Sequence, residues 1–151
     1  MYPSSKQTSF MQILFSLRNA FRTSRIALCS LIYFPIYFTF GGIISTFVLP
    51  YYTNPSLGLN LTIPSFETMI PLEFLRGFLY VVALLPIMAT LKLPKRILYL
   101  SVVALLYVAG AFVPFLTDST FPVFLRVVHG LEILADCFVF GGVIVYTLKR
   151  I

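Results

Sequence analysis

The chain has 151 residues, of which 59% are hydrophobic and only 11% are charged, and its formal net charge is +6. A soluble domain usually carries about 25% charged residues, so this chain lacks the polar surface that keeps a protein dissolved in water. The positive charge does not form a basic stripe interleaved with exposed aromatic residues, which argues against nucleic-acid binding. The composition therefore predicts an integral membrane protein whose surroundings are a lipid bilayer.

The first 25 residues are polar and basic. Residues 8–24 repeat apolar side chains at three- and four-residue spacing, while Arg18, Arg22 and Arg25 line another face. This pattern predicts a basic amphipathic helix that lies in the headgroup region, preceded by a short cytoplasmic tail. The alternative is that the same residues extend the first spanning helix into the cytoplasm. We treat residues 1–25 as one segment and 26–151 as a single transmembrane domain.

Four apolar runs are long enough to cross about 30 Å of hydrocarbon, approximately residues 26–49, 70–91, 97–116 and 121–148. They predict an all-α integral membrane protein, a four-transmembrane-helix bundle that follows the N-terminal amphipathic interfacial helix. Orientation follows from the basic residues, because Lys and Arg collect on the cytoplasmic side. The connections on one side of the bundle contain neither Lys nor Arg, and their only charged residues are Glu67 and Asp118. The other side carries Lys6, Arg18, Arg22, Arg25, Lys92, Lys95, Arg96, Lys149 and Arg150. Both termini are therefore predicted to be cytoplasmic, in a plasma (inner) membrane.

The second and fourth runs open alike. Pro71-Leu-Glu-Phe-Leu-Arg76 matches Pro122-Val-Phe-Leu-Arg126. The match allows two parallel hairpin repeats, an arrangement known in transporters with sites near the repeat interface. Arg76 and Arg126 would then occupy equivalent positions. Apolar helices also resemble one another by chance, so a duplication remains one of two interpretations.

The fourth run carries four ionisable residues on one face: Arg126, His129, Glu132 and Asp136. At about 100° per residue they fall within a stripe about 120° wide. A charge at the bilayer centre costs about 2.5–3.5 kcal/mol on insertion scales, so such residues persist where they pair, line water or carry chemistry. Centring the helix places Glu132 and Asp136 within about 5 Å of the midplane, with Arg126 near the outer boundary. The stripe predicts an intramembrane polar site that opens toward the non-cytoplasmic face.

The second run adds Glu73, Arg76 and Tyr80 to this site, on one face at helical spacing. Glu73 and Arg76 are close enough in sequence to form an ion pair with each other. Alternatively, Arg76 pairs with Glu132 or Asp136 across the bundle, and Arg126 pairs with Glu73. The sequence leaves both arrangements open.

Three functions fit these residues. We favour handling of protons, ions or a small polar solute by a homo-oligomer or a larger membrane complex, because four helices enclose little volume. A structural or accessory subunit is the second possibility, and a membrane-embedded redox or metal-binding protein is the third. His129 is the only histidine, so one copy cannot supply a bis-His haem, and the sequence requires no metal or other cofactor. No catalytic residue is assigned, since phosphate-binding glycine loops and nucleophile elbows do not occur.

Two glycine pairs lie inside the predicted spans, Gly41-Gly42 in the first and Gly141-Gly142 in the fourth. Small residues let membrane helices approach closely. We therefore assign all four glycines to helix packing.

Overall fold

The computed structural model describes residues 5–54, 56, 65–113 and 122–148, with the side chains of the first helix described from residue 23 onward. These residues form α1 (Ser5–Tyr52), α2 (Phe66–Thr90), α3 (Lys95–Tyr107), the π-helical segment η2 (Val108–Phe112) and α5 (Val123–Leu148). Within these ranges the chain contains helices and no strand.

Four helical stretches are long and apolar enough to cross a membrane. They are Thr23–Tyr52, Phe66–Thr90, Lys95–Phe112, in which η2 directly continues α3, and Val123–Leu148. The prediction of an all-helical chain with four span-length helices is therefore confirmed. The predicted ends of the third and fourth spans at residues 114–116 and 121 lie outside the described residues.

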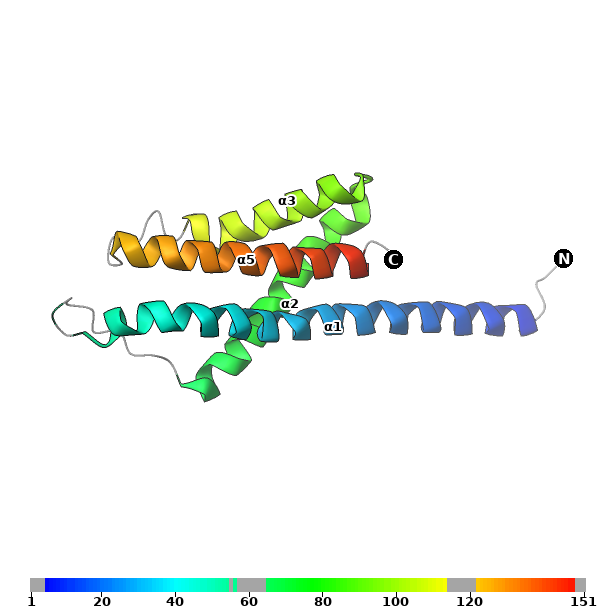
Figure 1. Cartoon of the computed structure of the whole chain (residues 1–151). Coiled ribbons are helices and arrows are strands. Elements are labelled where there is room, and N and C mark those ends of the chain that lie inside the picture. Colours follow the sequence, from blue (N-terminus) through cyan, green and yellow to red (C-terminus); the bar gives the residue numbers. More distant parts are fainter. Residues whose placement is uncertain (1–4, 55, 57–64, 114–121, 149–151) are drawn as a thin grey trace.

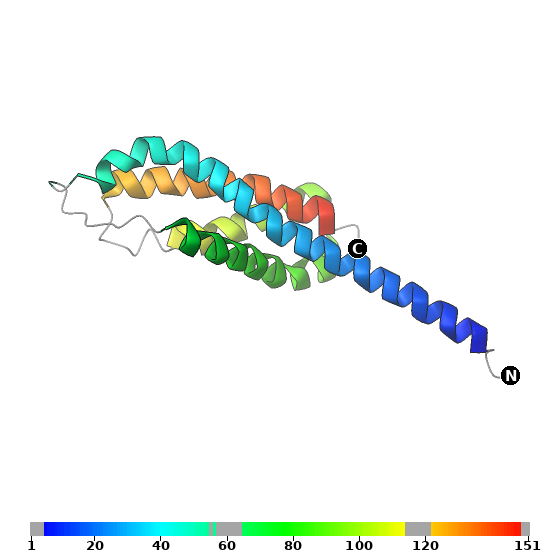
Figure 2. The ribbon, with the colours of Figure 1, turned by 90° about the horizontal axis from the view of Figure 1, so that it is seen from below.

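The N-terminal segment differs from the prediction. α1 is one uninterrupted helix of 48 residues, so the separate interfacial helix is wrong and the basic segment extends the first span. Neither Gly nor Pro occurs from residue 5 to residue 34, and without such a residue nothing in the sequence favours a break before the span. The N-terminal part of α1 projects well beyond the other helices (Figures 1 and 2). The side chains of Arg18 and Arg22 lie outside the described ones.

The helices share one cluster of buried side chains, with α5 at its centre. α5 packs against both α1 and α3, whereas α2 packs mainly against α1, which it crosses obliquely (Figure 1). Each of the four spans contributes to the cluster, through Tyr33, Val81, Val102 and Ile144 among others. The end of α1 lies beside the start of α5, and the start of α3 lies beside its end (Figure 1).

The outer surface of the protein is strongly apolar. Large side chains on every span are exposed, for example Phe47 at 61%, Leu100 at 57% and Leu131 at 60%. Soluble monomers rarely expose apolar patches of this extent. Lipid tails solvate such a surface without cost, as expected for a multi-pass membrane protein.

Candidate intramembrane polar site

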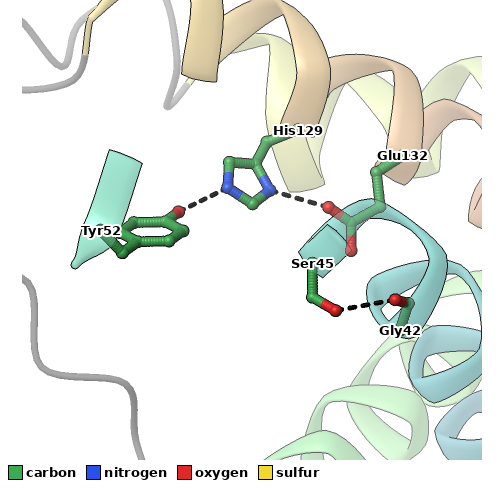
Figure 3. Close-up of polar contacts among 5 residues, drawn as sticks. All are labelled: Gly42, Ser45, Tyr52, His129 and Glu132. Atoms are coloured by element: carbon green, nitrogen blue, oxygen red, sulfur yellow. Dashed lines mark hydrogen bonds and ion pairs between the residues drawn. The ribbon is translucent and has the colours of Figure 1, made fainter. Parts of the chain in front are cut away.

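The end of α1 and the first half of α5 bring together Tyr52, His129 and Glu132 (Figure 3). The Tyr52 hydroxyl lies 2.5 Å from Nε2 of His129, and Nδ1 of His129 lies 2.7 Å from Oε2 of Glu132. His129 and Glu132 are three residues apart, so they share a helix face. Both ring nitrogens therefore have a hydrogen-bonding partner. In a neutral imidazole one nitrogen donates and the other accepts, so the direction of both bonds depends on the tautomer.

The Glu132 carboxylate is buried against α1. Glu132 is 6% exposed, and its Oε1 would lie 3.2 Å from a Cβ atom placed on Gly41. The missing side chain at Gly41 thus leaves the space that this carboxylate occupies. At the adjacent Gly42, a Cβ would meet nothing within 4 Å beyond the local backbone of its own helix, and its carbonyl accepts a hydrogen bond from Ser45 (Figure 3).

Asp136 lies one helical turn further along α5 and is 2% exposed. Both of its carboxyl oxygens are buried, and neither has a hydrogen-bond partner among the described residues. The side chain borders a cavity of about 10 Å³ whose polar lining also includes Tyr33, Tyr80 and Cys137. That volume is close to the minimum that holds one water molecule. Because a buried carboxyl group without partners is costly, the site is suited to binding a proton, a water molecule or both.

Glu73 and Arg76 form an ion pair within α2. Nη1 of Arg76 lies 3.1 Å from Oε2 of Glu73, whose side chain is 7% exposed. The guanidinium also lies over the ring of Tyr37 on α1, 6.0 Å from its centroid. Of the two arrangements that the sequence allowed, the described residues show this local ion pair and no ion pair of Arg76 or Arg126 across the helices. Tyr80, one turn beyond Arg76, is the residue of this group that borders the Asp136 cavity.

Arg126 lies apart from the other members of the predicted stripe. It is in the first turn of α5, and its buried Nε has no hydrogen-bond partner among the described residues. Arg76, in contrast, lies in the middle of α2, and the matching Pro71 is inside that helix. The repeat interpretation requires the two arginines to occupy equivalent positions along their helices, and they do not.

An added Cβ would lie closer than 3.0 Å to another helix at three glycines, Gly77, Gly110 and Gly141, of which only Gly141 was predicted. A Cβ on Gly141 would lie 2.9 Å from Cγ2 of Val103, so α3 approaches α5 closely there. At Gly142 the nearest atom, on Tyr99, is at an ordinary 3.6 Å. The tightest contact involves Gly77 of α2, where a Cβ would lie 2.6 Å from Cβ of Tyr33 on α1. Gly77 is a single glycine in an apolar run, and its sequence pattern gave no reason to select it.

Sequence reasoning selected Tyr80 but missed the other two tyrosines of the site, Tyr52 and Tyr33. Tyr52 lies at the end of a span, where aromatic residues are common membrane-interface anchors, so nothing distinguished it as a partner of His129. Tyr33 and Cys137 lie in apolar runs and give no polar signal of their own.

A metal centre has little geometric basis in the part of the chain that the structure describes. No group of three or more His, Cys, Asp or Glu side chains there is arranged to hold a metal ion. His129 and Glu132 contact each other, whereas Asp136 faces the separate cavity beside Tyr80.

No protein-family model, no curated protein and no solved structure matches this chain. Any function assigned to it therefore depends on the geometry of the site.

Proposed function

We propose that the chain is a four-helix transmembrane protein that takes up protons at Asp136 through a polar half-channel. The observation that carries this proposal is the hydrogen-bonded series Tyr52–His129–Glu132, which is followed one turn deeper by the unpartnered Asp136. Each member of the series exchanges protons through a hydroxyl, an imidazole or a carboxyl group.

The series has the chemistry of a proton relay. An imidazole that is hydrogen-bonded at both nitrogens can accept a proton at one and release the proton of the other. Glu132, whose carboxylate contacts Nδ1 of His129, is the group that accepts the proton on the side toward Asp136. Glu132 and Asp136 are four residues apart, so their Cβ atoms are about 5–6 Å apart. Two buried carboxylates at that separation repel, and the proposal therefore places the incoming proton on Asp136, whose oxygens have no hydrogen-bond partner among the described residues.

The polar route ends at Asp136. Beyond Cys137 the buried side chains of α5 are apolar, and they include Phe140, Ile144 and Leu148. Leu98 and Val102 of α3 lie in the same cluster. This apolar half closes the route, and the distribution of Lys and Arg supports a cytoplasmic position for the closed half. The open end, where α1 ends and α5 begins, then faces away from the cytoplasm, and both termini are cytoplasmic.

The dimensions of the site favour protons over larger solutes. The cavity at Asp136 has room for about one water molecule. A polar solute of several heavy atoms does not fit there. Transfer across the whole membrane would need a second half-channel, supplied by a second copy of the chain or by a larger complex.

Proton uptake by the purified protein in lipid nanodiscs tests the proposal. After a rapid rise in external proton concentration, a pH-indicator dye reports uptake, and infrared difference spectra report the C=O band of a newly protonated carboxyl group. We expect Asp136→Asn to remove that band and Glu132→Gln to slow its appearance. Glu67→Gln is the matched control, because Glu67 is an exposed carboxylate outside the site. Equal spectra for wild type and Asp136→Asn would refute the proposal.

A further inference from the structure

A groove between α5 and the end of α3 contains one charged side chain, that of Arg126. The groove has a volume of about 350 Å³ and is lined by apolar residues together with Tyr107, Arg126 and the backbone at Gly130. We call it the Arg126 groove. It is distinct from the Asp136 cavity, with which it shares no lining residue.

The guanidinium in this groove has no counter-charge among the described residues. Nε of Arg126 is buried without a hydrogen-bond partner, and no ion pair to Arg126 occurs among the described residues. A guanidinium carries five donors in a planar fork that matches a phosphate or carboxylate group. An unpaired charge in apolar surroundings is costly, so the chemistry of the groove calls for an anion.

A second polar group lies in the same groove. The Tyr107 hydroxyl would be 3.5 Å from a Cβ atom on Gly130, so the glycine leaves the floor of the groove open beneath this hydroxyl. Tyr107 is the last residue of α3 before the π-helical segment Val108–Phe112. π-Helical segments in otherwise regular helices frequently mark functional sites.

The rim of the groove faces the surroundings of the protein. Val123, Val127 and Leu131 recur every four residues along α5 and are 67%, 55% and 60% exposed. Such a ridge lies against acyl chains when the protein is in a bilayer. An occupant that enters the groove from this side therefore has an apolar part as well as an anionic group.

From these observations we infer that the Arg126 groove binds one anionic phospholipid, with its phosphate at Arg126 and an acyl chain along the exposed ridge. The position of Arg126 in the first turn of α5 agrees with the level of a headgroup, because a helix of 26 residues is about 39 Å long and exceeds the hydrocarbon thickness. The inference does not depend on proton uptake at Asp136, since different residues form the two sites.

Native mass spectrometry of the protein titrated with phosphatidylglycerol tests this assignment. We expect one lipid per chain to bind more tightly than phosphatidylcholine. Arg126→Gln should weaken that binding by about tenfold or more, the effect of losing a charge-assisted hydrogen bond. Arg96→Gln is the matched control, because Arg96 is exposed at the opposite end of the helices and its loss removes the same charge. Arg126→Lys should keep part of the affinity, since the charge remains but the fork is lost.

Gly130→Ile tests the groove without altering the charge, since the larger side chain would fill its floor. We expect this variant to bind phosphatidylglycerol less tightly while it retains the helical circular-dichroism spectrum. Equal affinity of wild type and Arg126→Gln, or equal affinity for the two lipids, would overturn the inference. A protein that co-purifies with wild type and is lost from Arg126→Gln, with lipid binding unchanged, would also overturn it, in favour of an acidic protein partner.

Discussion

The two halves of α5 are built on different principles although both are buried. From Arg126 to Asp136 the helix carries all of its described charged side chains together with His129, and His129 is hydrogen-bonded there to both Tyr52 and Glu132. From Phe140 to Leu148 the buried positions are apolar and closely packed, with Phe140 and Ile144 at most 1% exposed. One half of the same helix therefore forms the site, and the other half holds the helices together.

This division explains how the protein accommodates costly groups. In a bilayer the hydrophobic effect does not hold helices together, because lipid tails are as apolar as leucine, so the association depends on packing. The apolar half supplies that packing through Gly141, which lets Val103 of α3 approach. The polar half can then keep a carboxyl group without partners among the described residues, at Asp136. If the two halves of α5 differ in this way, substitutions in the apolar half should affect stability most. Substitutions in the polar half should affect proton transfer most.

The largest effect on stability is expected from Phe140→Ala. Phe140 is 1% exposed and its ring lies 4.8 Å from that of Tyr33, centroid to centroid. Its removal leaves a cavity that links the apolar half to the Asp136 site. We expect a loss of about 3 kcal/mol in the free energy of unfolding, the lower end of the range for such substitutions, because part of the hydrophobic term is absent in lipid. Unfolding of the reconstituted protein in increasing amounts of a denaturing detergent measures it.

Phe138→Ala is the control for this variant. Phe138 is two residues away on the same helix but 43% exposed, so lipid replaces its ring without leaving a cavity. A loss of similar size in both variants would show that the apolar half is not packed as described, and the contrast between the halves of α5 would fail.

Gly77→Ala should have the next largest effect. The new Cβ would lie 2.6 Å from Cβ of Tyr33 and 2.7 Å from the carbonyl oxygen of Ser30, so α1 and α2 must separate. We expect a destabilisation of about 1–3 kcal/mol, as for other overpacked cores. The same substitution at Gly42 meets open space and should stabilise the helix by about 0.5–1 kcal/mol, because alanine has the higher helix propensity. Thermal unfolding of both variants in one lipid mixture measures the difference, and equal midpoints would contradict the close contact.

The sequence predicts the spans well because their signal is local. Each predicted apolar run has at least the roughly 20 residues that a bilayer requires, and the ends of α2 and α5 follow the runs within a few residues. The prediction of a separate interfacial helix was wrong, because no local pattern marks where the basic helix ends. The spacing of Arg18, Arg22 and Arg25 shows that the segment is helical and basic, but only the lack of a helix-breaking residue shows that it continues into α1.

The site is predicted in part, because charge at membrane depth is visible in a sequence while its partners are not. The stripe selects His129, Glu132 and Asp136, which the structure places in or beside the hydrogen-bonded series Tyr52–His129–Glu132. The same stripe includes Arg126, which faces a different groove. The hydroxyl of Tyr52 comes from a helix 77 residues away in sequence, and no periodicity within α5 indicates it. Glycines at contacts between helices, such as Gly77, are equally invisible, because their role depends on what the neighbouring helix presents.

The smallest effect is expected from Tyr52→Phe, which tests the polar half of α5 most directly. This change removes the hydroxyl from Nε2 of His129 but keeps a ring that lies 6.0 Å from the imidazole, centroid to centroid. The loss of one hydrogen bond corresponds to about 1 kcal/mol, so we expect a fall of about fivefold in the rate of proton uptake, measured by stopped flow with a pH-indicator dye. Stability should change little, because Tyr52 is only partly buried.

Tyr51→Phe is the matched control for the relay. Tyr51 is the preceding residue on α1, and its ring packs against Phe124 of α5, with centroids 4.8 Å apart, so its contacts survive the loss of the hydroxyl. An uptake rate that falls equally in both variants would place the entry of protons elsewhere. A rate that falls in Tyr52→Phe alone, together with a stability that falls in Phe140→Ala alone, would show that the two halves of α5 separate transfer from packing.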